Sequence, residues 1–151
     1  AALAGALQAR GWMMATAESC TGGLIAAACT DLAGSSLWFE RGFVTYSNEA
    51  KTEMLGVDPA LIETHGAVSE VVARAMAFGA VRHSRAQAGV AVTGVAGPGG
   101  GTPDKPVGLV WFGFSVNGGL TSEKQHFSGD RAAVRAATVA HALRRLHELT
   151  G

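Results

Sequence analysis

The stretch Ala88–Gly94 (AGVAVTG) constrains the fold most, because every residue in it is small or β-branched. A strand made of these residues is apolar on both faces, which is typical of the centre of a sheet that helices cover on both sides. Other segments of the chain have the apolar periodicity of amphipathic helices, which would supply the covering layers. We therefore expect an α/β fold, a three-layer α/β/α sandwich around a central sheet.

A hairpin is expected after this strand. The segments Pro106–Val116 and Leu120–Phe127 flank Asn117-Gly118-Gly119. An Asn-Gly pair between two strand-like segments is the strongest short-range hairpin signal. The strands of a hairpin are antiparallel neighbours, so the central sheet is predicted to be mixed.

The remaining elements follow from periodicity and from helix start and stop signals. Strands are expected at residues 12–15 and 39–47. Helices are expected at residues 1–10, 21–31, 49–55, 59–65 and 70–84, and from Ser128 to the end, with Asn48 and Ser128 as N-caps. Residues 1–151 are expected to form a single domain, because 151 residues of which 48% are hydrophobic can fill one core.

The charge composition argues against two classes of partner. Twelve basic residues balance twelve acidic ones, so no general field attracts nucleic acid or an anionic membrane. No apolar run approaches the roughly 20 residues that span a bilayer, and the Ala-rich start lacks the basic region of a signal peptide. We expect a cytoplasmic protein that binds neither nucleic acid nor membranes.

The cysteines and histidines do not indicate a metal site. Cys20 and Cys29 have no CxxC spacing and no further cysteines to complete a disulfide framework or a zinc site. No pair among the five histidines has the i, i+4 spacing of a helical metal site. We expect reduced thiols, no metal and no cofactor.

The turn Thr16–Gly23 (TAESCTGG) joins a strand-like segment to a helix-like one and is the first candidate site. At such a turn, Ser19 would face the positive end of the helix, where free backbone N–H groups can hold an anion or a developing oxyanion. Ser19 could also act only as a helix N-cap. Cys20 is an alternative nucleophile if its pKa is depressed, and otherwise a small packed residue.

Lys51 lies in the first turn of a predicted helix, directly after a strand. The helix dipole disfavours a cation at this end by roughly 0.3–1 kcal/mol. One interpretation is a solvated surface lysine, because lysine is rarely buried. The other is a lysine whose pKa is lowered by burial and by the dipole, so that the neutral amine can act as a base.

Two further segments could bind an anionic ligand. The loop Gly94–Gly101 (GVAGPGGG) could bring its backbone close to a phosphate, notably at Gly94 and Gly97, and Thr93 could donate a hydroxyl. The loop matches neither a dinucleotide fingerprint nor a P-loop. Arg131 and Arg135 are four residues apart and could clamp a phosphate. A mobile turn and surface arginines are the alternative interpretations.

Six ordered motifs relate the chain to a known family. They are TAESCTGG (16–23), LAGSSLWFERGFVTYSNEAK (32–51), HGAVSE (65–70), TGVAGPGGG (93–101), KPVG (105–108) and SGDR (128–131). With these motifs the chain closely resembles the CinA C-terminal domain family over essentially its whole length. The resemblance implies hydrolysis of the carboxamide of nicotinamide mononucleotide, a pyridine nucleotide, to nicotinate mononucleotide and ammonia.

The resemblance also implies roles for single residues. It places a serine-lysine dyad at Ser19 and Lys51, with Tyr46 lining the same site. We expect the oxyanion hole at backbone N–H groups near Thr21 and Gly22. The ribose and phosphate would be held by Thr93, Gly94, Gly97, Arg131 and Arg135. A homodimer is expected, and the alternative function is a non-catalytic nucleotide-binding, competence-related regulatory or protein-interaction module.

Overall fold

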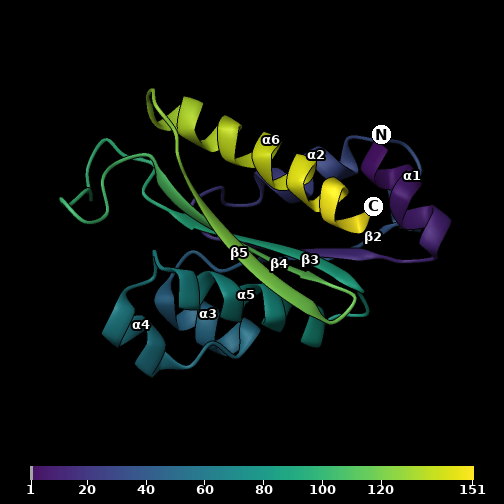
Figure 1. Cartoon of the computed structure of the whole chain (residues 1–151), viewed down its shortest axis with the longest axis horizontal. Helices are drawn as coiled ribbons and strands as arrows, with labels where there is room; N and C mark the ends of the chain where they lie inside the picture. The colour runs from purple at the N-terminus through teal and green to yellow at the C-terminus, as the bar shows by residue number, and fades with distance from the viewer. Residues whose placement is uncertain (1) are drawn as a thin grey trace.

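The computed structural model describes residues 2–151 and has a five-stranded mixed sheet at its centre (Figure 1). The strands are β1 (Met14–Glu18), β2 (Phe39–Val44), β3 (Ala88–Gly94), β4 (Leu109–Val116) and β5 (Gly119–His126). They lie in the order β2-β1-β3-β4-β5. Strand β1 is parallel to both β2 and β3, whereas β4 is antiparallel to β3 and to β5. The prediction of a mixed sheet is confirmed.

Helices cover both faces of the sheet, as Figure 1 shows. One face carries α1 (Ala2–Arg10), α2 (Leu24–Thr30) and α6 (Arg131–Thr150), and the other carries α3 (Asn48–Leu55), α4 (Pro59–His65) and α5 (Glu70–Arg82). A short 3-10 helix, η1 (Ser35–Leu37), leads into β2. Each face has its own apolar core, one built around Phe112 and Leu146 and the other around Met76 and Ala91. The three-layer α/β/α sandwich is therefore confirmed.

The central strand and the hairpin lie where the sequence predicted them. All of β3 is buried except its last residue, Gly94. The turn between β4 and β5 has positive φ at Asn117 (49°) and Gly118 (87°). Both central residues of a type I′ hairpin turn need positive φ, which explains the Asn-Gly pair.

Three helices begin differently from the prediction. Helix α2 starts at Leu24 rather than Thr21, because Gly22 and Gly23 have positive φ and cannot continue a helix. The cap of α3 is Ser47 rather than Asn48, since its hydroxyl accepts the N–H of Ala50. The cap of α6 is Asp130, whose carboxylate accepts the N–H of Ala133, rather than Ser128. The helix predicted at residues 1–10 is α1; Ala1 lies outside the described residues.

The carboxyl ends of the three parallel strands meet at one edge of the sheet. There the N–H of Ser19 donates to the carbonyl of Val92 at 3.1 Å, and the N–H of Thr45 donates to the carbonyl of Glu18 at 2.8 Å. Loops after such strand ends are where α/β proteins bind ligands. This edge carries the residues that follow β1, β2 and β3.

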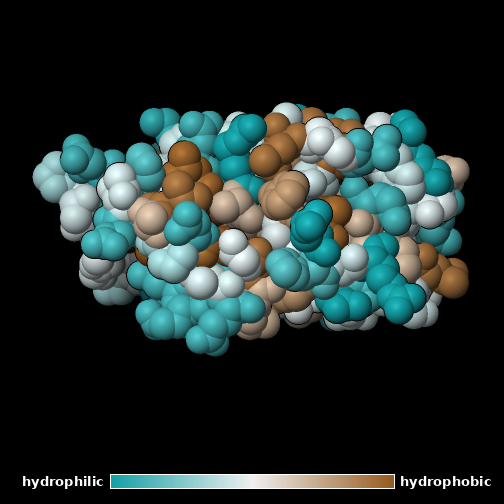
Figure 2. All heavy atoms as spheres, turned by 90° about the horizontal axis from the view of Figure 1, so that it is seen from below, coloured by the Kyte–Doolittle hydropathy of each residue, from teal (hydrophilic) through white to brown (hydrophobic). Residues whose placement is uncertain are grey.

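The face formed by α3, α4 and α5 is mostly hydrophilic. Seen from this side, apolar residues form small groups separated by polar ones (Figure 2).

Within residues 2–151, no helix combines the length and the hydropathy needed to cross a bilayer.

Candidate active site

Ser19 and Lys51 form a buried pair. The Nζ of Lys51 lies 3.1 Å from the Oγ of Ser19. Lys51 is 1% exposed and Ser19 is 8% exposed. The lysine reaches the serine because β1 and β2 are adjacent and parallel, which places the residue after β1 beside the helix that follows β2. Lys51 is therefore not a solvated surface residue.

The amine of Lys51 is held by its own connecting segment. It donates to the carbonyl oxygens of Thr45 at 2.9 Å and Tyr46 at 3.3 Å, and lies 3.5 Å from that of Ser47. Burial lowers the pKa of Lys51, against smaller raising effects of Cys20 and Glu49. A neutral amine has two N–H groups and one lone pair. With the N–H groups on the two nearer carbonyls, the lone pair is free to accept the hydroxyl proton of Ser19.

A pocket of about 240 Å³ opens onto this pair. Of the residues expected from the sequence, the pocket brings together Ser19, Tyr46, Lys51, Thr93, Gly94 and Arg131. Its remaining lining comes from Cys20, Asn48, Ala67, Val68 and Ala96. Thr21, Gly22, Gly97 and Arg135 do not line it. Segments that follow three different strands thus build one small chamber.

Several of the lining residues contribute otherwise than expected. The side chain of Tyr46 is 63% exposed, and it is the carbonyl that contacts the amine. The hydroxyl of Thr93 donates to the carbonyl of Ala67 at 3.0 Å, so it can accept from a ligand but not donate to it in this arrangement. A Cβ at Gly94 would lie 2.8 Å from the carbonyl oxygen of Leu109. That glycine is therefore required by packing against β4.

Cys20 is not an activated nucleophile. Its thiol is buried, and burial, with a smaller contribution from the charge of Glu18, raises its pKa to about 11. The thiol is therefore protonated near neutral pH, and the thiolate is the nucleophilic form. Between the two neighbouring candidates, the structure favours Ser19.

Glu18 occupies the N-terminal end of α2, where the sequence predicts free N–H groups for an anion. One carboxylate oxygen accepts from the hydroxyl of Thr21 at 2.5 Å and from the N–H groups of Gly23 at 3.2 Å and Ile25 at 2.9 Å. The other accepts from the N–H of Ala26 at 2.9 Å. The expectation that this helix end offers free N–H groups to a ligand is therefore wrong. The signal in the sequence was a glutamate at the end of an otherwise apolar strand, which needs partners once buried.

The two arginines do not form one clamp. Arg135 donates to the carbonyl oxygens of Cys20 at 3.2 Å and Thr21 at 3.1 Å, so it braces the turn that carries Ser19. Arg131 donates to the carbonyl of Gly97 at 2.9 Å and lines the pocket. Of the two, Arg131 is the one that can reach a ligand there.

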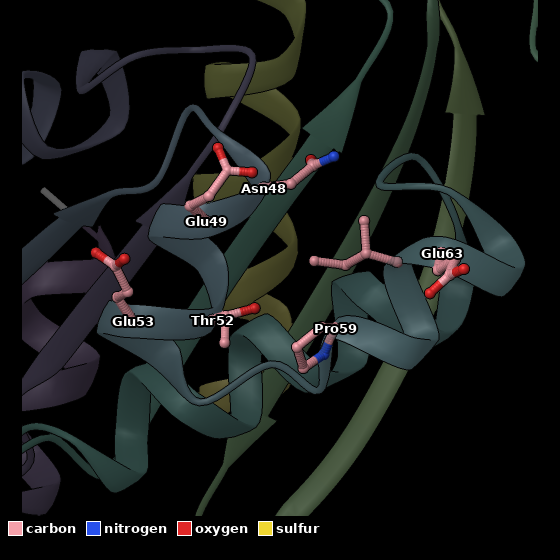
Figure 3. Close-up of a pocket in the computed structure, with 7 residues that line it drawn as sticks. Asn48, Glu49, Thr52, Glu53, Pro59 and Glu63 are labelled. Carbon is pink, nitrogen blue, oxygen red and sulfur yellow. The ribbon is translucent and has the colours of Figure 1, made fainter.

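A second hollow of about 420 Å³ lies between α3 and α4 (Figure 3). Glu49, Glu53 and Glu63 are among its lining residues, and Asn48 lines both this hollow and the pocket of Ser19. In the described part of the chain, residues 2–151, no group of three or more His, Cys, Asp or Glu side chains is placed to hold a metal ion. The three glutamates therefore line the hollow between α3 and α4, on the other side of Asn48 from Ser19. The pocket of Ser19 itself is lined by the cationic side chain of Arg131.

Comparisons of the sequence and of the fold with known proteins point to the same family. The family model described as the CinA C-terminal domain matches residues 1–150. The nicotinamide-nucleotide amidohydrolase PncC of Enterobacter agglomerans is 59% identical over 131 residues, which cover 86% of this chain and 80% of that protein. The protein of the same name from Escherichia coli K12 is 55% identical over 142 residues, or 93% of this chain and 86% of that protein.

A solved structure shares the whole fold. The crystal structure of a competence-damaged protein (CinA) superfamily protein from Klebsiella pneumoniae 700603 matches with a TM-score of 0.95 at 40% identity, covering 99% of this chain and 93% of that one. Family model, relatives and structure all match over nearly the full length. The chain belongs to the CinA C-terminal domain family.

Proposed function

We propose that this protein is an amidohydrolase that converts nicotinamide mononucleotide to nicotinate mononucleotide and ammonia. The observation that carries the proposal is the buried amine of Lys51, 3.1 Å from the hydroxyl of Ser19 in a pocket. Relatives at 55–59% identity are named nicotinamide-nucleotide amidohydrolase, which supports a reaction of this class. A serine hydroxyl next to a side chain that can act as a base is the arrangement that acyl transfer by a serine requires.

The reaction proceeds through an acyl-enzyme. Neutral Lys51 takes the hydroxyl proton of Ser19 while Oγ attacks the carboxamide carbon. The tetrahedral intermediate collapses as the protonated lysine returns that proton to the leaving nitrogen, which departs as ammonia. A water then attacks the ester, Lys51 takes a proton from it and passes it to Oγ of Ser19, and nicotinate mononucleotide is released.

The backbone after the nucleophile supplies the oxyanion hole. The N–H of Gly22 donates to the carbonyl of Ser19 at 3.1 Å and is not available. Among residues 2–151, no oxygen accepts the N–H of Thr21 or that of Cys20, which has only its own thiol as a partner; both residues are buried, and Cys20 lines the pocket. Buried N–H groups without an acceptor are rare and call for an explanation. We assign them to the oxyanion, where one such donor is worth about 2.7–4 kcal/mol of barrier.

The charges around the pocket orient the nucleotide. Arg131 lines the pocket and is tied to the glycine-rich loop through Gly97. The hollow beyond Asn48 carries three glutamates and repels a phosphate. The ribose and phosphate therefore lie along Thr93, Gly94 and Arg131, and Arg135 supports the nucleophile turn behind them.

One assay tests the proposal. Purified protein incubated with nicotinamide mononucleotide is expected to release ammonia and form nicotinate mononucleotide in equal amounts. A non-catalytic nucleotide-binding or regulatory module predicts heat of binding in calorimetry without ammonia release. Binding without turnover would therefore replace the enzyme by that alternative.

We also propose that two copies of the chain associate through the side of the sheet at β2. This strand lies at the sheet edge, and Leu37, Val44 and Tyr46 around it are exposed apolar side chains. Light scattering is expected to give twice the chain mass of 15.4 kDa. Val44→Glu should shift the mass to that of a monomer, whereas Phe78→Glu, on α5, should not. A monomeric wild-type protein contradicts the proposal.

The cytoplasmic location of the protein stays a prediction.

A further inference from the structure

We infer that Glu18 is a positioning residue that holds the nucleophile turn in its reactive shape. The inference rests on the proposed function, since it assigns Glu18 to the same reaction. Glu18 directly precedes Ser19 and is fully buried, with 0% exposure. No salt bridge joins it to a cation in the part of the chain that the structure describes. A buried carboxylate without a cation must be satisfied by hydrogen bonds.

The hydrogen bonds of the Glu18 carboxylate all come from the turn and the helix that follow it. Its donors are the hydroxyl of Thr21 and the N–H groups of Gly23, Ile25 and Ala26. Both oxygens act only as acceptors here, because an N–H can only donate. One side chain therefore links the end of β1 to the start of α2 and encloses Ser19 between them.

The opposite side of the turn is held by Arg135. It binds the carbonyl oxygens of Cys20 and Thr21. The carbonyl of Cys20 and the N–H of Thr21 belong to one planar peptide and point in opposite directions. Arg135 therefore also sets the direction of the Thr21 N–H, one of the two donors assigned to the oxyanion. Glu18 and Arg135 together leave this peptide little freedom to rotate.

The turn needs such support, because its own residues do not rigidify it. Gly22 and Gly23 have φ values of 58° and 109°. Glycine adopts many other backbone conformations as readily. Without Glu18, the N–H groups of Gly23, Ile25 and Ala26 lose their acceptor, and the peptides between Ser19 and α2 are free to reorient. A small displacement of reacting groups lowers the rate by up to about 100-fold.

A purely structural cap makes a different prediction. It predicts that loss of Glu18 lowers the melting temperature and leaves the kinetics of the folded enzyme unchanged. A positioning role predicts a loss in kcat at nearly constant KM, because the bound substrate is held by other segments. It also predicts slower attack of Ser19 on any electrophile.

The test compares Glu18→Gln with the pair Thr21→Val and Thr21→Ser. The glutamine side chain has the shape of glutamate, but its NH₂ group replaces one of the two oxygens. This group faces backbone N–H donors and cannot accept a hydrogen bond from them. We expect kcat for ammonia release to fall about 10- to 100-fold with KM within about twofold. Valine removes the hydroxyl that binds Glu18 and should lower kcat by several-fold, whereas serine retains it and should restore kcat. If Glu18→Gln does not fold, the Thr21 pair decides.

A second readout does not depend on the natural substrate. A small phosphonofluoridate is attacked by an activated serine and releases fluoride, and mass spectrometry gives the rate at which Ser19 is labelled. We expect slower labelling in Glu18→Gln and Thr21→Val. Thr138→Val, which removes a buried hydroxyl hydrogen bond of 2.7 Å within α6, serves as the control with unchanged kcat and labelling.

The outcomes separate the two proposals. Wild-type protein that is labelled but releases no ammonia contradicts the proposed function, and the labelling rates still test Glu18. Folded Glu18→Gln and Thr21→Val variants with wild-type kcat and labelling overturn the positioning role, whatever the substrate. If Thr138→Val lowers kcat and the labelling rate as much as Thr21→Val does, the positioning role is also overturned, since the effect would then be one of general stability.

Discussion

Ser19→Ala is expected to lower ammonia release from nicotinamide mononucleotide by at least about 10⁴-fold, equivalent to about 5.5 kcal/mol of barrier. The alanine cannot form the ester intermediate. The protein should nevertheless fold, because within residues 2–151 the hydroxyl makes one hydrogen bond, with Lys51, whose amine keeps its contacts with Thr45 and Tyr46. The cost in stability should stay near 1 kcal/mol. Steady-state ammonia assays and thermal unfolding measure the two effects.

Ser115→Ala provides the matched control. Ser115 is also a buried serine, but it lies in β4 and does not line the pocket of Ser19. It should retain the activity of the wild type. Folded Ser19→Ala that keeps more than a tenth of the activity would show that Ser19 is not the nucleophile.

Lys51→Ala is expected to cost about 10³- to 10⁴-fold in kcat, because the base that takes the serine proton is lost. The substitution also leaves a space beside Ser19, which a small primary amine such as ethylamine can enter. Added amine should therefore restore part of the activity, and more basic amines should restore more. Lys124→Ala, on β5 and outside this pocket, should not respond to amine. Full activity of folded Lys51→Ala would exclude the dyad.

The pH dependence of the wild-type enzyme follows from the same residue. Burial lowers the pKa of Lys51, so the amine loses its proton at a lower pH than an exposed lysine does. Only the neutral amine can accept a proton. We therefore expect kcat/KM to rise with pH through this pKa and to fall about tenfold per pH unit below it. A pH profile that falls as the pH rises would contradict the assignment of Lys51 as the base.

The layers of the fold were predictable from local patterns. The apolar run of β3 required cover on both faces, and Asn117-Gly118 specified a hairpin, because each depends on neighbouring residues only. Helix starts were less predictable, as α2 and α6 show. Their caps depend on which of several polar side chains folds back onto the helix, and Glu18 reaches α2 from the preceding strand.

The contact between Ser19 and Lys51 was predictable, but its supporting contacts were not. Lys51 was identified as electrostatically out of place, which is a local property. That Arg135 binds the carbonyls of Cys20 and Thr21 depends on contacts 114–115 residues apart in the chain. Spacing on α6 indicated an arginine pair, but it could not show that the two guanidinium groups turn to different partners. The family resemblance indicated Ser19 and Lys51 as a pair, but not the residues that hold them in place.

The residues that line the pocket come from two separate parts of the sequence. Ser19 and Lys51 come from the first 51 residues, whereas Thr93, Gly94 and Arg131 come from the second half. Within residues 2–151, no hydrogen bond joins the glycine-rich loop after Gly94 to Ser19 or Lys51, so we expect the loop to change in length and composition without moving this pair. Under the proposed function, we therefore expect that evolution or mutagenesis can alter the choice of nucleotide in that loop while Ser19 and Lys51 retain the hydrolytic chemistry.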